Sequence, residues 1–188
     1  IQSIEYDLKR LPEFCRMINY LTLGKLLGYM IDSYEKLVEF VASNSAAHSG
    51  VFKVTIDLKQ PEAVDVVMHL LADADVLVQN LAPGASARMG LSFEALRARY
   101  PKLIVCDISG YGADGPYRDK KAYDLLIQSE AGFLSITGTP ETPSKSGNSI
   151  ADIAAGMYAY TNILSALILR GRTGEGSHID VSMLEALG

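Results

Sequence analysis

Hydrophobic residues in the first quarter of the chain recur at the spacing of an α-helix. These apolar positions are Leu23, Leu26, Leu27, Met30, Leu37, Val38 and Val41. Their intervals predict an amphipathic helix, and the polar run Ser43–Gly50 follows it. We therefore expect residues 1–49 to form a helical segment with an organisation of its own.

From Val51 onward, short apolar runs alternate with helical patterns. The predicted strands are Val54–Leu58, Val76–Val78, Leu103–Ile108 and His178–Met183. The predicted helices are Pro61–Leu71, Phe93–Arg99, Tyr123–Ala131 and a long one from Ser149 that ends at Gly171, Gly174 and Gly176. Strands that alternate with helices predict an α/β fold, in which crossover helices connect the strands of a parallel sheet.

Two of these elements carry more detailed predictions. The helix that begins at Pro61, a residue tolerated in a first turn, is expected to place Val64, Val67, Met68 and Leu71 on one face. The segments Val76–Val78 and Leu103–Val105 are entirely apolar. This character is typical of parallel strands that are covered on both faces.

The longest apolar stretch, Ile150–Leu169, is about as long as a helix that spans a bilayer. It contains the polar residues Asp152 and Asn162, however, and a short polar turn follows it. We therefore expect a buried core helix and no membrane span.

The composition excludes several classes of protein. With 48% hydrophobic and 21% charged residues among 188, the chain has the composition of a globular domain. Its 17 basic and 22 acidic residues give a net charge of −5, without a basic block, so neither nucleic acid nor an anionic membrane is the expected partner. Cys15 and Cys106 lie far apart and fit core positions in a reducing, cytoplasmic compartment. The chain begins at Ile1 without a leader-like segment, so we expect a processed chain or a piece of a longer one.

Candidate chemistry is expected in the loops that follow the strands, because ligands of open parallel sheets bind there. These loops are Gln79–Gly90, Gly110–Tyr123 and Thr137–Asp152. In the first, Asn80 and Arg88 could bind a polar ring and a phosphate; the alternative is a Pro83–Gly84 turn with a solvated arginine. Taken one at a time, Lys59, Lys121 and Arg118 fit surface charges.

Asp152 is the carboxylate of most interest, because it lies in the first turn of a helix almost without other charges. One interpretation is structural: Ser149-x-x-Asp152 resembles a capping box. The other is a carboxylate nucleophile that the helix N-terminus keeps ionised. The motifs of serine hydrolases, zinc proteases and common dinucleotide enzymes are missing. The histidines His48, His69 and His178 are far apart in sequence and fit structural or surface positions.

Several short motifs have a family resemblance when they are taken together. They are Ile56-Asp57-Leu58-Lys59-x-Pro61, Ala74–Asn80, Pro83–Gly84, Arg88–Leu91, Ile108–Gly112, Gly115–Tyr117, Lys121–Asp124, Ile150–Gly156 and Asp180–Ala186. In this order they closely resemble the family III coenzyme A transferases, which include formyl-CoA transferase and carnitine CoA-transferase. The resemblance covers about residues 50–188 and implies part of that family's large, Rossmann-like α/β domain.

The resemblance also implies a reaction and a set of site residues. An aspartate at the position of Asp152 attacks the thioester of an acyl-CoA, and CoA is carried to a carboxylic acid through an aspartyl-CoA thioester. The residues implied to border CoA are Ile56, Lys59, Asn80, Leu81, Arg88, Lys121 and Tyr123, with Arg88 at the nucleotide phosphates and Lys121 and Tyr123 near the pantetheine arm and thioester. No metal or redox cofactor is implied, since CoA is itself a substrate.

Tyr123 bears on one alternative activity. The related α-methylacyl-CoA racemases pair the aspartate with a histidine where this chain has Tyr123. A racemase needs two acid–base groups, and a tyrosine, with an ordinary pKa of about 10, suits that task poorly. The residues therefore favour transferase over racemase.

The chain departs from the family pattern in two regions. The family's first strand, turn and helix have no match in residues 1–49, and a second, smaller domain would follow the equivalent of Gly188. The resemblance implies an interlocked homodimer that acts on an acyl-CoA and a small carboxylic acid, such as succinate or a related short acid. A truncated, non-catalytic CoA-binding or oligomer-forming remnant is the alternative.

Overall fold

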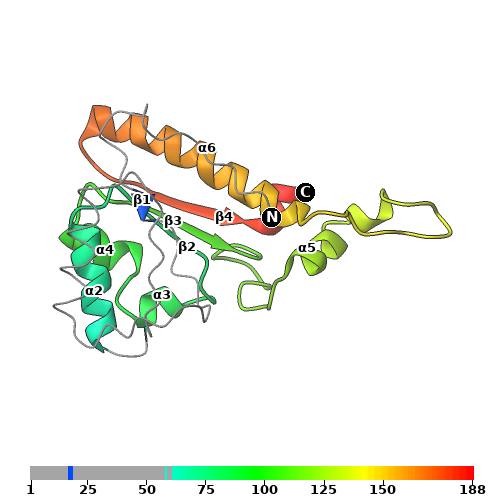
Figure 1. Cartoon of the computed structure of the whole chain (residues 1–188), viewed down its shortest axis with the longest axis horizontal. Helices are drawn as coiled ribbons and strands as arrows, with labels where there is room; N and C mark the ends of the chain where they lie inside the picture. Colours follow the sequence, from blue (N-terminus) through cyan, green and yellow to red (C-terminus); the bar gives the residue numbers. More distant parts are fainter. Residues whose placement is uncertain (1–16, 19–57, 59–60) are drawn as a thin grey trace, which may run out of the picture. The chain divides into compact units, whose positions relative to one another are not determined.

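The computed structural model describes residues 17–18, 58 and 61–188 (Figure 1). The chain divides into two compact units, Ile1–Asp75 and Val76–Gly188, and each is described by itself. The first contains strand β1 (Met17–Ile18) and helix α2 (Pro61–Ala72), which confirms the helix predicted to begin at Pro61. The helix predicted within residues 23–41 lies outside the described residues. So does the strand predicted at 54–58, apart from Leu58, which lies in a turn.

Helix α2 buries a face slightly different from the predicted one. Val67 and Leu71 are buried as expected, but Val64 and Met68 are only partly so. Ala63 and Val66 are buried in their place. The buried face is therefore turned by about one position from the predicted face.

The second unit is built on a three-stranded parallel sheet in the order β2–β3–β4, which confirms the predicted α/β class. Its strands are β2 (Val76–Gln79), β3 (Ile104–Ser109) and β4 (His178–Ser182). Its helices are α3 (Ala85–Arg88), α4 (Phe93–Arg99), α5 (Asp124–Glu130), the 3-10 turn η2 (Phe133–Ser135), α6 (Ile150–Thr173) and α7 (Met183–Leu187). The predicted strands of this unit agree with these bounds to within one or two residues, and so do its three predicted helices, apart from the end of the long one. The short elements α3, η2 and α7 were not predicted.

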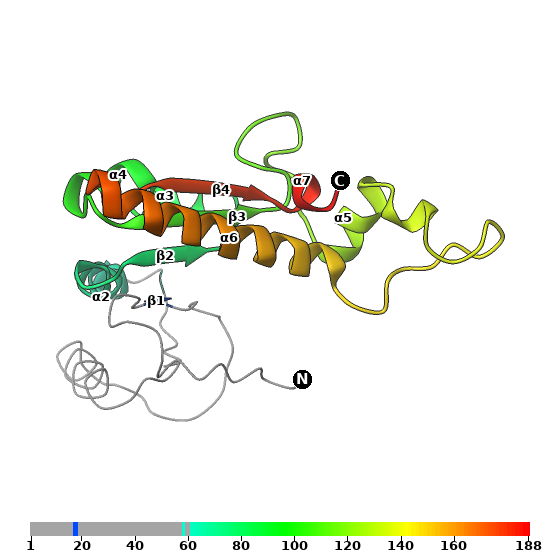
Figure 2. The ribbon, with the colours of Figure 1, turned by 90° about the horizontal axis from the view of Figure 1, so that it is seen from above.

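Helix α6 covers one face of this sheet (Figures 1 and 2). The buried side chains along the helix are Ala151, Ala155, Ala159, Ile163 and Ala166, and they share a core with Ile104, Cys106 and Val181 of the sheet. Alanine at four of the five positions lets the helix approach the strands closely.

The opposite face of α6 is exposed, so the prediction of a buried core helix holds for one face only. Seven large apolar side chains of this face are exposed: Ile153, Met157, Tyr158, Tyr160, Leu164, Ile168 and Leu169. By length and composition alone the helix could cross a membrane. We call this set of seven residues the outer face of α6.

Helices α3 and α4 lie on the other side of the sheet (Figure 1). Helix α4 begins where the Ser92 Oγ accepts a hydrogen bond from the Ala95 amide, and Leu96 is fully buried. The expectation of strands covered on both faces holds for Leu103–Val105, which are buried, but in β2 only Val76 is fully buried. Further along the strands, the Asp107 carboxylate forms hydrogen bonds with both Gln79 and His178.

Two of the three glycines predicted to end the long helix have distinct roles. Gly174 is the C-terminal cap of α6, with a φ of 78° that favours glycine. Gly176 lies so close to the Leu103 carbonyl oxygen that a Cβ would come within 2.0 Å of it. Gly171 lies inside the helix, so the predicted end there is wrong; the chain stays helical to Thr173.

Candidate functional site

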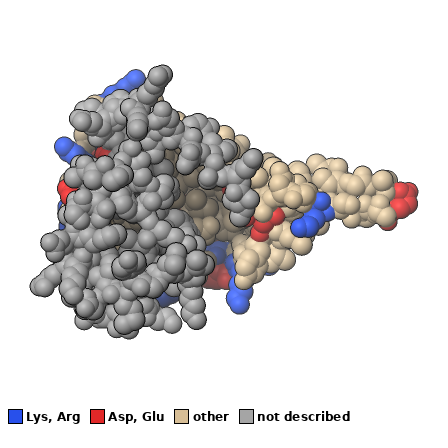
Figure 3. All heavy atoms as spheres, viewed as in Figure 1, with Lys and Arg blue, Asp and Glu red and all other residues tan. Residues whose placement is uncertain are grey.

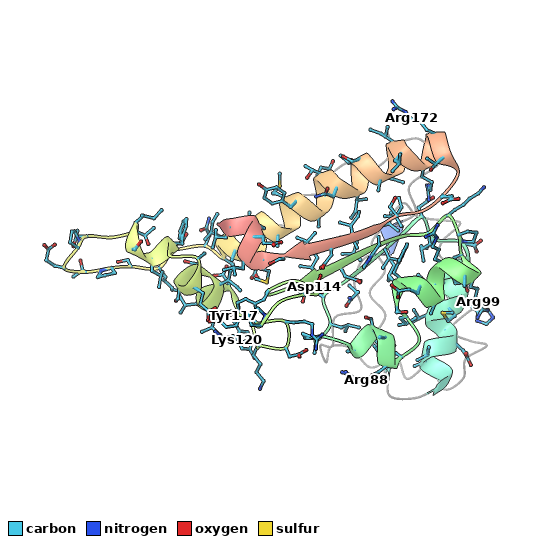
Figure 4. The ribbon with its side chains drawn as sticks, turned by 180° about the vertical axis from the view of Figure 1, so that it is seen from behind. Arg88, Arg99, Asp114, Tyr117, Lys120 and Arg172 are labelled. Atoms are coloured by element: carbon cyan, nitrogen blue, oxygen red, sulfur yellow. The ribbon has the colours of Figure 1, made fainter. Side chains whose placement is uncertain are left out.

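The loop after β2 carries three of the predicted site residues. Asn80 and Leu81 directly follow the strand, and Arg88 is the last residue of α3. Gly84, with a φ of 71°, begins that helix, and a Cβ at Gly84 would lie 3.1 Å from Arg88 Nη1. The predicted Pro-Gly turn therefore exists and places the exposed arginine back over the same loop (Figure 4).

The loop after β3 is fixed at its start by Gly110. The Gly110 carbonyl accepts a hydrogen bond of 3.0 Å from the Leu184 amide. A Cβ at Gly110 would lie 2.0 Å from the Cβ of Ala122, so only glycine permits this contact. Through Ala122 the segment Lys121–Tyr123 lies against the carboxyl end of β3. Lys121 and Tyr123 are exposed there, Tyr123 by 68%.

Lys120 rather than Lys121 holds this loop in shape. Its ammonium group lies 4.3 Å from the ring centre of Tyr117 and 5.5 Å from that of Tyr111, and it forms an ion pair with Glu130 (Figure 4). These contacts combine a cation–π attraction with a charge pair. Sequence spacing alone does not indicate this role, because Glu130 lies ten residues further along the chain. Arg118, in contrast, pairs with its neighbour Asp119 at the surface, as a surface charge does.

Asp152 lies in the first turn of α6, as predicted, but the predicted capping box is wrong. The Ser149 side chain makes no capping hydrogen bond. Instead, Asp124 Oδ1 accepts hydrogen bonds from the amides of Ala151 (2.9 Å) and Asp152 (3.3 Å). A carboxylate from α5 thus satisfies two amides that a helix leaves unpaired at its start.

Asp124 is itself held in place by a buried glutamine. Gln128 Nε2 donates a hydrogen bond of 2.6 Å to Asp124 Oδ2, and Gln128 Oε1 accepts one of 3.3 Å from the Ser146 amide. Gln128 is only 1% exposed. A buried amide with both ends bonded has one orientation available, so it fixes the start of α6 relative to α5.

The electrostatics of Asp152 differ from the expectation. Burial raises its pKa, and the negative charge of Asp124 raises it further. The helix N-terminus was expected to favour the ionised form, but the loss of solvation and the second carboxylate outweigh it. The residue as a whole remains exposed and open to a reactant. A carboxylate of raised basicity is a stronger nucleophile once it is ionised.

The structure therefore brings the predicted site residues together in two groups. Tyr123 precedes Asp124, which binds the Asp152 amide, and Asn80, Leu81 and Arg88 share the segment after β2. The loops that carry Asn80 and Tyr123 follow the carboxyl ends of the neighbouring parallel strands β2 and β3, and Asp124 links Asp152 to the second of these loops. The predicted site residues Ile56 and Lys59 lie outside the described residues.

The remaining candidates among the described residues have structural settings. His178 forms a hydrogen bond with Asp107, and His69 one with the Asp65 carbonyl in its own helix. Cys106 is fully buried, and burial raises the pKa of its thiol to about 12. Within residues 61–188, no three His, Cys, Asp or Glu side chains gather as metal ligands. Basic and acidic side chains lie next to one another on the face seen in Figure 3.

Comparison with known proteins gives a consistent result. The model of CoA-transferase family III matches residues 41–187. The chain is 43% identical over 141 residues to the succinate–glutarate CoA-transferase of Agrobacterium fabrum, covering 74% of this chain and 35% of that one. It is 35% identical over 153 residues to the human succinyl-CoA:glutarate CoA-transferase, covering 78% of this chain and 35% of that one.

A solved structure is also similar. A CaiB/BaiF family protein from Brucella suis superposes with a TM-score of 0.71 at 40% sequence identity, over 73% of this chain and 37% of that one. The chain thus spans about a third of the length of the curated relatives it matches.

Proposed function

The chain belongs to CoA-transferase family III, and from that premise we propose that it transfers coenzyme A between carboxylic acids through a thioester on Asp152. The observation that carries the proposal is the setting of this aspartate. It is exposed at the start of a helix, its amide is fixed by Asp124, and its pKa is raised. Each of these properties suits a carboxylate that must attack a thioester from a fixed position.

The proposed reaction has four steps. The Asp152 carboxylate attacks the donor thioester, and CoA leaves as a thiolate from a mixed anhydride. The thiolate attacks the aspartyl carbonyl of the anhydride, which forms aspartyl-CoA and releases the donor acid as its carboxylate. The acceptor carboxylate then attacks aspartyl-CoA, so a second anhydride forms and CoA leaves again. Attack of that thiolate on the acceptor's carbonyl gives the new acyl-CoA and restores Asp152.

The other site residues have supporting roles in this proposal. Arg88, exposed above Gly84, would bind the nucleotide phosphates through its guanidinium group. Asn80 and Leu81 would border the nucleotide, as would Ile56 and Lys59 by family resemblance. Lys121 and Tyr123, exposed next to Asp124, would border the pantetheine arm and the thioester.

The relatives narrow the substrate class. The names of two relatives contain succinate or succinyl-CoA together with glutarate. We therefore propose succinyl-CoA as a donor and a small dicarboxylate as acceptor, in a cytoplasmic protein. The outer face of α6 supports the further proposal of a homodimer, since exposed apolar side chains in this number are typical of an interface.

The proposal is tested by following CoA transfer from succinyl-CoA to isotope-labelled glutarate in the protein and in Asp152→Ala. Loss of transfer in Asp152→Ala is the expected result. Asp119→Ala is the matched control, because Asp119 is an exposed carboxylate that pairs only with Arg118 among the described residues. Transfer that survives in Asp152→Ala would contradict the proposal. Exchange of an α-proton without CoA transfer would instead indicate a racemase.

A further inference from the structure

A row of polar side chains crosses the sheet on the face opposite α6. Gln79 of β2, Asp107 of β3 and Asp180 of β4 are in register on three neighbouring strands. Cys106 and Ile108 on either side of Asp107 belong to the core under α6. Since side chains alternate along a strand, Asp107 points to the other face.

Both oxygens of the Asp107 carboxylate are used. Oδ1 accepts a hydrogen bond of 2.8 Å from Gln79 Nε2, and Oδ2 lies 2.8 Å from His178 Nε2. The Asp107 side chain is 24% exposed, so these contacts are partly shielded from water. On its far side, the His178 ring stacks on Phe93 with 4.8 Å between ring centres. Asp107 is thus held from both neighbouring strands.

The orientation of Gln79 follows from its bond to Asp107. A carboxylate accepts only from the Nε2 end of the amide, which leaves Oε1 at the other end. Gln79 Oε1 accepts a hydrogen bond of 2.7 Å from the Leu81 amide, two residues further along the chain. If the amide turned over, Nε2 would face the Leu81 amide and both bonds would be lost.

We propose that Gln79 and Asp107 are positioning residues for the nucleotide half of acyl-CoA. Asp107 orients Gln79, Gln79 fixes the backbone at Asn80 and Leu81, and this backbone forms one wall of the CoA site; His178 and Phe93 hold Asp107 in turn. The inference rests on the proposed function, which places CoA at these loop residues. The new element is that the affinity for CoA depends on Gln79 and Asp107, whose side chains do not contact CoA.

The experiment compares two acyl donors, succinyl-CoA and succinyl-pantetheine, which lacks the nucleotide. In Gln79→Ala and Asp107→Ala we expect KM for succinyl-CoA to rise about tenfold, the equivalent of one lost hydrogen bond to a charged group. We expect kcat, and the kinetics with succinyl-pantetheine, to stay within about twofold. In Asp107→Asn the Oδ1 acceptor for Gln79 remains, so KM should stay close to that of the wild type.

Ser165→Ala is the matched control, because it removes one side-chain hydrogen bond on α6, which covers the other face of the sheet, and leaves Gln79, Asp107, His178 and Phe93 unchanged. The proposal would be overturned if the variants raised KM equally for both acyl donors, or if the control showed the same rise in KM. The network would then have only a structural role. Variants that bind succinyl-CoA as the wild type does would overturn it as well. A wild type that fails to bind succinyl-CoA would contradict the proposed function itself, a different and distinguishable result.

Discussion

Asp124 Oδ1 lies 3.3 Å from the amide nitrogen of Asp152 and 2.9 Å from that of Ala151. The side chain of Asp124 thus fixes the backbone of a second aspartate, 28 residues further along the chain. Burial raises the pKa of Asp152, and the nearby negative charge of the same Asp124 carboxylate raises it further. Position and basicity of the proposed nucleophile are therefore coupled through Asp124.

This coupling predicts a shift in pH dependence. Asp152 must be ionised to attack, so the rate of its modification rises with pH through its pKa. Burial raises this pKa, and the charge of Asp124 raises it further; Asp124→Asn removes that charge and keeps an oxygen for the amides, although it loses the hydrogen bond from Gln128 to Oδ2. The rise in rate should therefore move to lower pH. The measurement is the initial rate of CoA adduct formation against pH.

Asp119→Asn, which removes an exposed negative charge elsewhere, is the control for the net charge of the protein. Its pH profile should match that of the wild type. An unchanged profile in Asp124→Asn would show that Asp124 does not act on the ionisation of Asp152.

The contact between Gly110 and Ala122 predicts the result of a residue swap. Gly110→Ala places a Cβ 2.0 Å from that of Ala122 and should destabilise the fold by about 1–3 kcal/mol. In the double variant, Gly110→Ala with Ala122→Gly, the atom nearest to the new Cβ at residue 110 is the Cα of residue 122. The distance of 3.5 Å is an ordinary contact. The double variant should therefore regain most of the stability in urea-induced unfolding. A double variant no more stable than Gly110→Ala would contradict this account of the close approach.

The buried thiol of Cys106 predicts resistance to alkylation. Because its pKa is about 12, almost no thiolate exists at pH 8, and the side chain is inaccessible. In a Cys15→Ser background, iodoacetamide should leave the Cys106 peptide unmodified in the folded protein and label it fully in urea, as peptide mass analysis will report. Comparable labelling in both conditions would place Cys106 outside the core.

The outer face of α6 predicts an effect on assembly. Ile168 is 64% exposed, so Ile168→Glu should cost little in the isolated chain but disrupt a homodimer that buries this face. Light scattering after size-exclusion chromatography should show a dimer for the wild type and a smaller species for the variant. Arg172→Glu, an exposed charge change on the same helix, is the control and should remain dimeric. A monomeric wild type would contradict the proposed dimer.

The sequence predicted local elements well where local signals agree. Helix α4 has its predicted bounds, because Ser92 provides a cap and Leu96 a buried contact one turn later. At Ser149 a similar signal failed. The pattern Ser149-x-x-Asp152 predicts a local cap, but Asp124, distant in sequence, takes the same amides once α5 packs against α6.

Local position in the sequence was enough to select candidate residues. Asp152, Asn80 and Arg88 were selected because they follow a predicted strand or begin a predicted helix, and their roles stay predictions. The link between Gln79, Asp107 and His178 was missed, because it depends on the register of three parallel strands. Sequence spacing alone does not specify that register.

The most direct test of the central claim is peptide mass analysis after brief incubation with succinyl-CoA, with wild type and Asp152→Ala in parallel. The account predicts a CoA-sized adduct on the wild-type peptide that contains Asp152, with no such adduct in the variant. CoA transfer without an adduct at Asp152, or an adduct that persists in Asp152→Ala, would contradict the role of this aspartate as the nucleophile.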